Sequence, residues 1–375
     1  YCDANKQFAT IYLNDNKTNL YTPALITRLF PGDHKIKISL VNHRSDSAKV
    51  KVEAGKTSYL YFNLEDTSKW VSYTISNSPL TSNHLSSIVV DKNNVKWIGT
   101  RDQGLFSFDD KKWNIYQKSN SQLIYDFINY LSVDDQNNLW IATTGGLMRK
   151  NGNQWIDYSS NLPSTYVTSI AHDKNGITWI GTSNGLVKFN GSSWIVFNTS
   201  NSTIPSNFIT TVAVDNSNNI WIGTSSNGVG YFNGSTWQNY NMNNMKLPVN
   251  VGNSIKYVKV DINGIVWVAH VQNLIAGEQG GLTSFDGTSW KQVSLVGLPT
   301  QQVEYIYIDS NKNKWIATKN GFGYFLNDFS VKVFNTTNSP LTASQVVGLV
   351  IDKNFDLFVA TYGGGMCKVK RYNYY

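Results

Sequence analysis

Three side chains in the second half of the chain could carry out chemistry together: His270, Glu278 and Glu304. A histidine with two carboxylates can bind a divalent metal ion or act as a general acid and base. Glu278 and Glu304 are also the only two glutamates after residue 66. The phosphate-loop motif GxxxxGK and the zinc-protease motif HExxH do not occur. Any reaction therefore depends on whether the fold brings these three residues together.

A repeated tetrapeptide defines the elements that must position them. The pattern Trp-Ile-Gly-Thr occurs seven times, with small variations, at intervals of 39 to 48 residues, and an aspartate stands six residues before each copy. In the fifth copy His270 replaces the threonine. The copies begin at Trp97, Trp140, Trp179, Trp221, Trp267, Trp315 and Phe358. Repeats of this length are typical of the four-stranded blades of a β-propeller.

Each repeat contains the signals of four short antiparallel strands. In the third repeat a β-rich run at residues 167–171 precedes the Trp179 strand, and Asn190-Gly191 forms a turn before the last strand. Fourth strands are marked by Trp70, Trp113, Trp155, Trp194, Trp237, Trp290 and Phe329. The last repeat lacks such a strand, and Trp70 precedes the first complete blade, so we expect the Trp70 strand to close the ring. The sequence predicts an all-β fold with a single seven-bladed β-propeller over residues 67–375.

The regular placement of the tryptophans and aspartates favours a structural role for both. Six tryptophans fall in second strands and six in fourth strands, where they would face neighbouring blades and form core. Each of the seven aspartates stands alone in its turn, without a second carboxylate at the spacing of a calcium loop. We therefore expect the aspartates to accept hydrogen bonds from turn amides.

Residues 1–66 have a different pattern from the ring. Runs of alternating apolar residues, such as residues 9–14 and 59–64, are separated by Gly, Pro and Asn turns, which predicts a small β-sandwich. The succession over residues 8–65 resembles the PEGA family of small envelope-associated β domains. The tetrapeptide that names the family is replaced here by Val52-Glu53-Ala54-Gly55. Residues 66–69 are the expected linker.

The ring resembles the two-component-regulator propeller repeats of bacterial sensor proteins and related secreted proteins. The resemblance covers residues 70–370 and depends on the repeated Asp, Trp-Ile-Gly-Thr and Gly-Leu elements. It implies a propeller that recognises a ligand such as an oligosaccharide and, in sensors, passes a signal to a kinase. This chain has one ring where such sensors commonly have two, and it has no kinase. The two resemblances imply an exported bacterial envelope protein, periplasmic or on the cell surface, that binds a ligand.

Composition excludes several classes of partner. The chain has 32 Lys and Arg against 25 Asp and Glu, but the surplus forms no basic stripe, so we expect no nucleic-acid partner. No run of 18 apolar residues occurs, so we expect no membrane span. Cys2 and Cys367 lie at opposite ends, which excludes a CxxC site, while Cys2 could be a lipid attachment point. We expect a monomer without cofactor or metal.

The start of each innermost strand supplies a further set of candidates. One position after the first apolar residue, the repeats have Ser86, Asn129, Thr168, Thr210, Lys256, Glu304 and Val347. Lys256 and Glu304 are charged and belong to consecutive blades. We interpret them first as an inter-blade ion pair, which contributes little stability when exposed. The alternative is a pair of polar anchors in the mouth of a ligand site.

Long irregular loops share one face of the ring, because loops between blades and loops between second and third strands emerge on the same side. Loops on a rigid scaffold often carry function. The candidate ligand-binding residues are Tyr125, Asp126, Tyr166, Phe208, Lys256, His270, Gln272, Glu278, Gln302, Glu304, Lys319 and Tyr362. Their aromatic, amide and charged groups suit stacking and hydrogen bonding to a sugar or a peptide. The sequence favours a non-catalytic protein that recognises a glycan or an envelope protein on this face.

Two other functions stay open. His270 with Glu278 and Glu304 resembles, in residue types, the site of streptogramin lyases, which are seven-bladed propellers that use His and Glu around a divalent metal. Against this, His172 is expected on the opposite face and His84 on a distant blade. A purely structural or assembly role is the third alternative.

Overall fold

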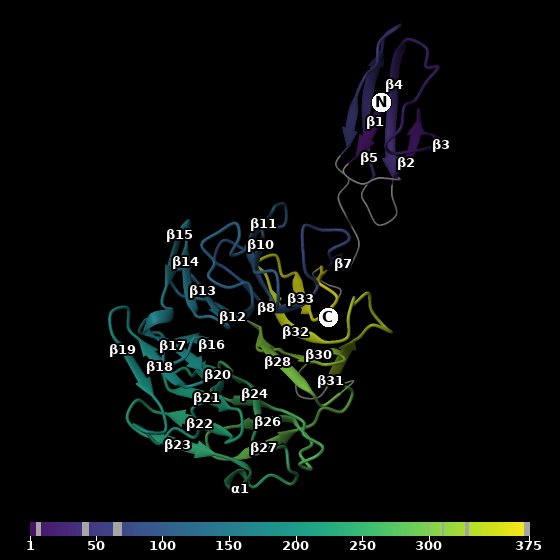
Figure 1. The fold of residues 1–375 in the computed structure, drawn as a ribbon. Helices are drawn as coiled ribbons and strands as arrows, with labels where there is room; N and C mark the ends of the chain where they lie inside the picture. Colours follow the sequence, from purple (N-terminus) through teal and green to yellow (C-terminus); the bar gives the residue numbers. More distant parts are fainter. Residues whose placement is uncertain are drawn as a thin grey trace. The chain divides into compact units, whose positions relative to one another are not determined.

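The computed structural model describes residues 1–4, 9–39, 45–62, 70–298, 300–309, 311–326 and 330–370. The chain divides into two compact units, Tyr1–Lys69 and Trp70–Tyr375. Figure 1 draws the strands of the first unit in purple and those of the second from blue to yellow. The expected linker at residues 66–69 and the strand marker Phe329 lie outside the described residues. Within the described part of the chain, no helix is long and apolar enough to cross a membrane.

The first unit is a small sandwich of two sheets. In one sheet β1 (Cys2–Ala4) pairs in parallel with β6 (Leu60–Phe62). The other has the order β3-β2-β4-β5 and contains β2 (Thr10–Leu13), β3 (Asn16–Tyr21), β4 (Gly32–Ser39) and β5 (Asp46–Val52). Alternation along β4 buries Ile36 and Ile38 in one core with Cys2 and Phe62, as the sequence predicted. Because Cys2 is only 1% exposed, its thiol is not accessible to a lipid while β1 is folded.

The second unit contains seven four-stranded antiparallel sheets among the described residues. Blades 1 and 2 are β8 (Leu85–Val90), β9 (Lys96–Thr100), β10 (Leu105–Phe108), β11 (Trp113–Tyr116), and β12 (Ile128–Val133), β13 (Leu139–Thr143), β14 (Leu147–Asn151), β15 (Gln154–Asp157). Blades 3 and 4 are β16 (Val167–His172), β17 (Thr178–Thr182), β18 (Gly185–Phe189), β19 (Trp194–Phe197), and β20 (Ile209–Val214), β21 (Ile220–Thr224), β22 (Val229–Phe232), β23 (Trp237–Tyr240). Blades 5 and 6 are β24 (Ile255–Val260), β25 (Val266–His270), β26 (Gly281–Phe285), β27 (Trp290–Val293), and β28 (Val303–Ile308), β29 (Lys314–Thr318), β30 (Gly321–Leu326), β31 (Ser330–Phe334). Blade 7 is β32 (Val346–Ile351), β33 (Leu357–Thr361), β34 (Met366–Val369) and β7 (Trp70–Tyr73). Two short helices, η1 (Ser159–Asn161) and α1 (Met242–Met245), follow β15 and β23.

The ring closes through the strand that the sequence singled out. β7 pairs antiparallel with β34, so that Trp70 lies opposite Val369 and Tyr73 opposite Met366. The innermost strands contact one another in the order β8, β12, β16, β20, β24, β28 and β32, and β32 contacts β8 again (Figure 1). This closure leaves no free inner edge. The predicted seven-bladed propeller, closed at Trp70, is confirmed.

Aspartate turns join the first and second strands of the blades. One carboxylate oxygen of Asp91 accepts hydrogen bonds from the backbone N–H groups of Asn93 and Val95, at 2.8 and 2.9 Å. The other oxygen accepts the indole N–H of Trp97 at 2.9 Å. The same indole-to-carboxylate bond recurs at Trp140, Trp179, Trp267 and Trp315. The predicted turn role of the aspartates is confirmed, because their oxygens are used by turn amides and by the tryptophans of the core.

Candidate functional site

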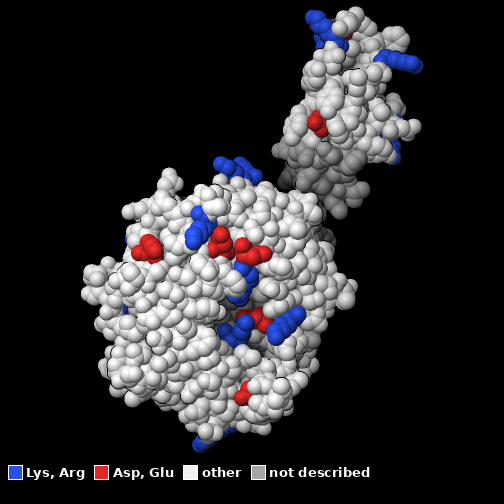
Figure 2. Space-filling model, viewed as in Figure 1, with Lys and Arg blue, Asp and Glu red and all other residues white. Residues whose placement is uncertain are grey.

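A bulge in every innermost strand builds the candidate site. In all seven strands the pairing shifts at the residue after the first apolar one. A bulge re-aims the side chain of the extra residue. The bulged residues are the seven that the sequence singled out, Ser86, Asn129, Thr168, Thr210, Lys256, Glu304 and Val347. All of them line one cavity of about 300 Å³, here called the mouth, which Figure 2 shows as the hollow at the centre of the ring.

Three consecutive bulged residues tie their blade to the next one. The side-chain amide of Asn129 donates to the carbonyl oxygen of Val167 at 2.7 Å. The hydroxyls of Thr168 and Thr210 donate to the equivalent carbonyl oxygens of the following blades, also at 2.7 Å. These three polar groups are therefore occupied by the fold, and this part of the mouth is structurally fixed.

Within the described part of the chain, the other four bulged residues, in blades 5, 6, 7 and 1, donate no such hydrogen bond to a carbonyl oxygen of the next blade. Lys256 and Glu304 form an ion pair with 2.9 Å between Nζ and a carboxylate oxygen. The Lys256 side chain is 43% exposed, whereas that of Glu304 is only 7% exposed. The hydroxyl of Ser86 is buried without a hydrogen-bond partner. The inter-blade ion pair is thus present, and both of its members also line the mouth.

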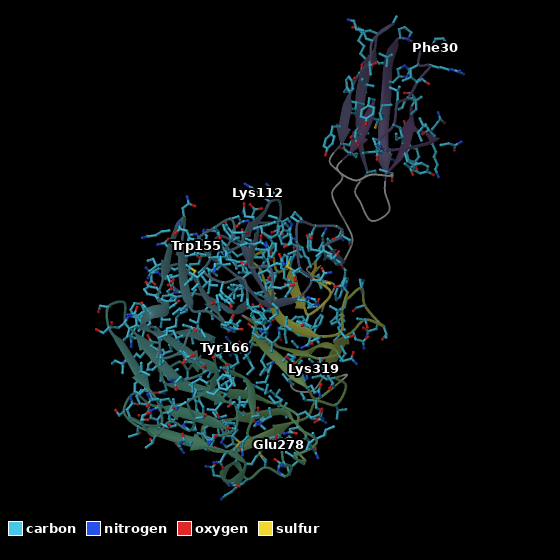
Figure 3. The ribbon with its side chains drawn as sticks, viewed as in Figure 1. Phe30, Lys112, Trp155, Tyr166, Glu278 and Lys319 are labelled. Carbon is cyan, nitrogen blue, oxygen red and sulfur yellow. The ribbon has the colours of Figure 1, made fainter. Side chains whose placement is uncertain are left out.

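Two aromatic rings stand at the rim of the mouth. Tyr166 precedes β16 and Phe208 precedes β20, and both line the cavity. Their ring centroids are 6.2 Å apart in an edge-on arrangement, and both rings are partly open to solvent. Figure 3 shows Tyr166 close to the centre of the ring and Glu278 nearer its outer edge. A ring-shaped ligand group could stack here, because aromatic faces suit flat apolar surfaces.

Arg101 belongs to the mouth as well, although the sequence analysis did not single it out. Its guanidinium lies 5.1 Å from the ring centroid of Phe127, and its Nη1 donates to the side-chain oxygen of Asn129 at 3.4 Å. A sequence signal existed, because Arg101 follows the repeated tetrapeptide. Lys319 and Tyr362, both among the sequence candidates, occupy the equivalent positions of other blades.

Tyr130, Tyr257 and Tyr305 form the floor of the mouth. The hydroxyls of Tyr130 and Tyr257 are 3.1 Å apart, and the ring of Tyr305 packs 4.6 Å from that of Tyr257. Tyr130 and Tyr305 also line a second cavity, of about 580 Å³, that reaches the aspartate turns. Burial raises the pKa of Tyr257 well above its usual value, so this hydroxyl stays neutral. The mouth therefore has a neutral, hydrogen-bonded floor.

Four of the twelve sequence candidates line the mouth, namely Tyr166, Phe208, Lys256 and Glu304. The other eight lie outside its lining: Tyr125, Asp126, His270, Gln272, Glu278, Gln302, Lys319 and Tyr362. Some of these eight have structural partners. The amide of Gln302 donates to that of Gln272 across two blades, Asp126 accepts the backbone N–H of Lys118, and Tyr362 packs on His84.

His270 lies in the interior, where it cannot meet a ligand. It is 1% exposed, its Nδ1 lies 2.8 Å from the carbonyl oxygen of Gly252, and its Nε2 lies 2.9 Å from the Thr283 hydroxyl. Burial lowers the pKa of His270 to about 4, so the ring is neutral near pH 7. Both nitrogens are thus occupied, and no group of three or more His, Cys, Asp or Glu suited to a metal occurs among the described residues. The acid–base and metal hypotheses both depended on His270, and His270 is not available for either role.

The fold and the mouth define a class of protein, a β-propeller with a ligand-sized cavity at its centre, accompanied by a small β-sandwich. Residues 2–68 match the PEGA domain, and residues 161–184 and 203–226 match the two component regulator propeller. The family models therefore match the first unit and two stretches of the ring, in agreement with the two sequence resemblances. No curated protein matches the chain in sequence.

Solved structures share this fold at low sequence identity. The extracellular domain of a hybrid two component system from B. thetaiotaomicron aligns over 90% of this chain and 44% of its own, with 21% identity and a TM-score of 0.67. PorZ, a surface component of the type-IX secretion system of Porphyromonas gingivalis, aligns over 90% and 51%, with 17% identity and a TM-score of 0.60. Virginiamycin B lyase from Staphylococcus aureus aligns over 80% and 97%, with 11% identity and a TM-score of 0.59. This chain spans less than half of the first of these proteins.

Proposed function

We propose that the protein is an exported, non-catalytic recognition protein of the bacterial envelope, and that its propeller binds a glycan in the mouth. The observation that carries this proposal is the cavity of about 300 Å³ lined by an aromatic pair, hydroxyls and charged groups. Export is supported by the solved structures that share this fold, because they include an extracellular domain and a bacterial surface component.

The chemistry of the mouth suits a sugar. Tyr166 and Phe208 offer apolar faces to a pyranose ring, while Lys256 and Glu304 offer a donor and acceptors to its hydroxyls. Binding sites of this kind combine apolar walls with a few oriented polar groups. The rigid scaffold of seven blades holds these groups in place, because the bulges that aim them are part of the innermost strands.

The test is a thermal-shift screen of the full chain against neutral and acidic oligosaccharides, since a ligand that binds the folded state raises the melting temperature. Tyr166→Ala and Phe208→Ala should each abolish the shift of a binding sugar. Tyr362→Ala is the matched control, because Tyr362 is also exposed but does not line the mouth. A sugar whose shift survives both mouth variants would place binding elsewhere and contradict the proposal.

One observation favours a second function, the binding of an envelope protein. Leu274 and Ile275 lie next to each other in the loop after β25, and Leu274 is 73% exposed while Ile275 is fully exposed. Exposed apolar loop tips of this kind are typical of protein contacts. Leu274→Ser with Ile275→Ser should abolish capture of such a partner without changing sugar-induced thermal shifts. Capture that is unaffected by the double variant would contradict this second function.

A further inference from the structure

We infer that the glycan bound in the mouth carries a carboxylate, and that Arg101 with Ser86 forms the subsite for it. The inference rests on the proposed function and adds the charge class of the ligand. Uronate-containing oligosaccharides supply both a ring for the aromatic pair and a carboxylate for the guanidinium.

Arg101 is a positioned cation without an acidic partner. Among the residues that the structure describes, no carboxylate forms an ion pair with it, and the hydrogen bond that its side chain donates to Asn129 is long at 3.4 Å. Asn129 is itself held by Val167, and Phe127 lies against the guanidinium. The planar guanidinium can donate two parallel hydrogen bonds to a carboxylate, which makes it the side chain best suited to that group.

Ser86 provides a second donor beside Arg101. The two segments are joined, because the backbone N–H of Arg101 donates to the carbonyl oxygen of His84 at 3.0 Å. Ser86 is 8% exposed, its hydroxyl has no partner, and it lines the same cavity as Arg101. A buried hydroxyl without a partner is costly. Because the hydroxyl oxygen is itself buried, it reaches a carboxylate held by Arg101 only after the serine side chain rotates toward the cavity, and the bond would then remove this cost.

The charge balance of the mouth also favours an anion. Its lining contains three ionic side chains, Arg101, Lys256 and Glu304. Because Lys256 and Glu304 neutralise each other, the net charge of one positive unit belongs to Arg101. Figure 2 shows charged side chains gathered around the central hollow, while most of the surrounding surface of this face is uncharged. Within the mouth, an anionic group therefore meets its counter-charge at Arg101.

The experiment compares acidic oligosaccharides with neutral counterparts of the same ring stereochemistry. Short oligogalacturonates and oligomannuronates, each paired with its carboxyl-reduced form, are titrated calorimetrically into the full chain, with the peptide Glu-Glu-Glu as an acidic non-sugar. We expect one acidic sugar to bind at least about tenfold more tightly than its reduced form, as hydrogen bonds to charged groups imply. Arg101→Gln should remove this preference and Arg101→Lys should weaken it. Lys319→Gln, at the equivalent position of another blade but outside the mouth, should leave it intact.

The outcomes separate the inference from the function beneath it. Equal binding of the acidic and reduced sugars, lost in Tyr166→Ala, would overturn the carboxylate subsite and leave the glycan function standing. A preference for the acid that survives Arg101→Gln, in a variant whose melting temperature is unchanged, would overturn the role of Arg101. Binding of Glu-Glu-Glu alone would overturn the inference together with the glycan function. Binding of no probe would overturn the uronate inference, and the glycan function would then be decided by the wider oligosaccharide screen.

Discussion

The propeller contains two groups of charged side chains that differ in burial and in the number of their partners. One is the seam cluster, composed of Lys96, Asp110, Asp352, Asp356 and Lys368, which joins blade 1 to blade 7. The other consists of Arg101, Lys256 and Glu304 in the mouth. Lys96 and Asp352 are fully buried, whereas the Lys256 side chain is 43% exposed.

The difference separates charges that serve the fold from charges that are available to a ligand. In the seam cluster Lys96 contacts Asp110 and Asp352, and Lys368 contacts Asp110 and Asp356, so every member has an opposite charge. Burial alone would raise the pKa of Asp110, but hydrogen bonds from Lys368 and Lys96 bring it below its usual value. In the mouth, Arg101 has no such partner among the described residues. A buried charge whose partners are complete belongs to the fold. A charge that faces the cavity and is exposed, as Lys256 is, or has no ionic partner within the described part of the chain, as for Arg101, is a candidate for binding.

The largest effect is expected from Lys96→Ala. The change removes a buried cation from between two carboxylates, and breaking a buried pair in this way costs about 3–5 kcal/mol. Denaturant unfolding of the full chain measures the loss of free energy. Lys111→Ala is the control, because Lys111 is exposed and lies in the same turn as Asp110. A loss below about 1 kcal/mol, the range of exposed pairs, would remove the distinction between seam and mouth.

The second prediction concerns the pH dependence of the seam cluster. The pKa of Asp110 lies below its ordinary 3.8 in the folded state, so its contribution is present above about pH 4 and is lost as the pH falls further. The pKa of Lys368 lies above its ordinary 10.5 because hydrogen bonds to Asp110 and Asp356 outweigh the effect of burial. Its contribution is complete below about pH 10 and is lost as the pH rises through the folded value.

The pKa of the buried His270, lowered from 6.5 to about 4, adds a loss of stability as the pH falls below about 6.5. Stability should therefore be highest between about pH 7 and 9, and Asp110→Asn should flatten the part of the acidic slope below about pH 4. Melting temperatures recorded for both proteins from about pH 2 to about pH 10 check the prediction. Unchanged acidic slopes would mean that other carboxylates carry the acid sensitivity.

The sequence identified the fold but not the seam cluster, and the reason is physical. The aspartate, tryptophan and turn signals repeat within each blade, so they are local and can be counted along the chain. The seam cluster joins residues more than 250 positions apart, such as Lys96 and Asp352, which no repeat places together. The residue before the second-strand aromatic is apolar at Leu139, Ile220, Val266 and Leu357, but it is lysine at both 96 and 314 and threonine at 178. This position alone therefore did not distinguish Lys96 as a member of a cluster.

The candidate site, like the fold, could be predicted from the sequence only where its residues recur in each repeat. The seven bulged positions were found because they recur at fixed places in the strands. His270 and the loop residues could not be placed, because a loop residue's surroundings depend on neighbouring blades. His270 also replaces a buried threonine, and Thr100, Thr143 and Thr182 at its equivalents are all buried. That equivalence is a local signal for burial rather than catalysis.

The third prediction tests the mouth pair. Replacing Lys256 and Glu304 together by Thr, the residue that blades 3 and 4 use, should change the free energy of unfolding by less than about 1 kcal/mol. Sugar binding in the mouth should nevertheless fall, because the ligand loses two polar partners. Calorimetric titration and denaturant unfolding of the same sample measure the two effects. A large loss of stability without loss of binding would assign this pair to the fold, like the seam cluster.

The smallest effect is expected from Ser86→Thr, which should turn a binding residue into a structural one. Thr168 and Thr210 occupy equivalent bulges, and their β-branched side chains have few rotamers, which directs the hydroxyl to the next blade's carbonyl oxygen. Threonine at 86 should make the same bond and stabilise the fold by about 0.5–1.5 kcal/mol.

Because the hydroxyl would then be occupied, the acidic sugar should bind more weakly to Ser86→Thr while its neutral counterpart is unaffected. Thr168→Ser is the matched opposite, since it should lose stability without changing the preference for the acid. If Ser86→Thr gains stability and keeps the full preference, Ser86 is no part of the carboxylate subsite. Arg101 would then hold the anion without Ser86. The part of the mouth that is available to a ligand would then begin at Lys256 and would not include Ser86.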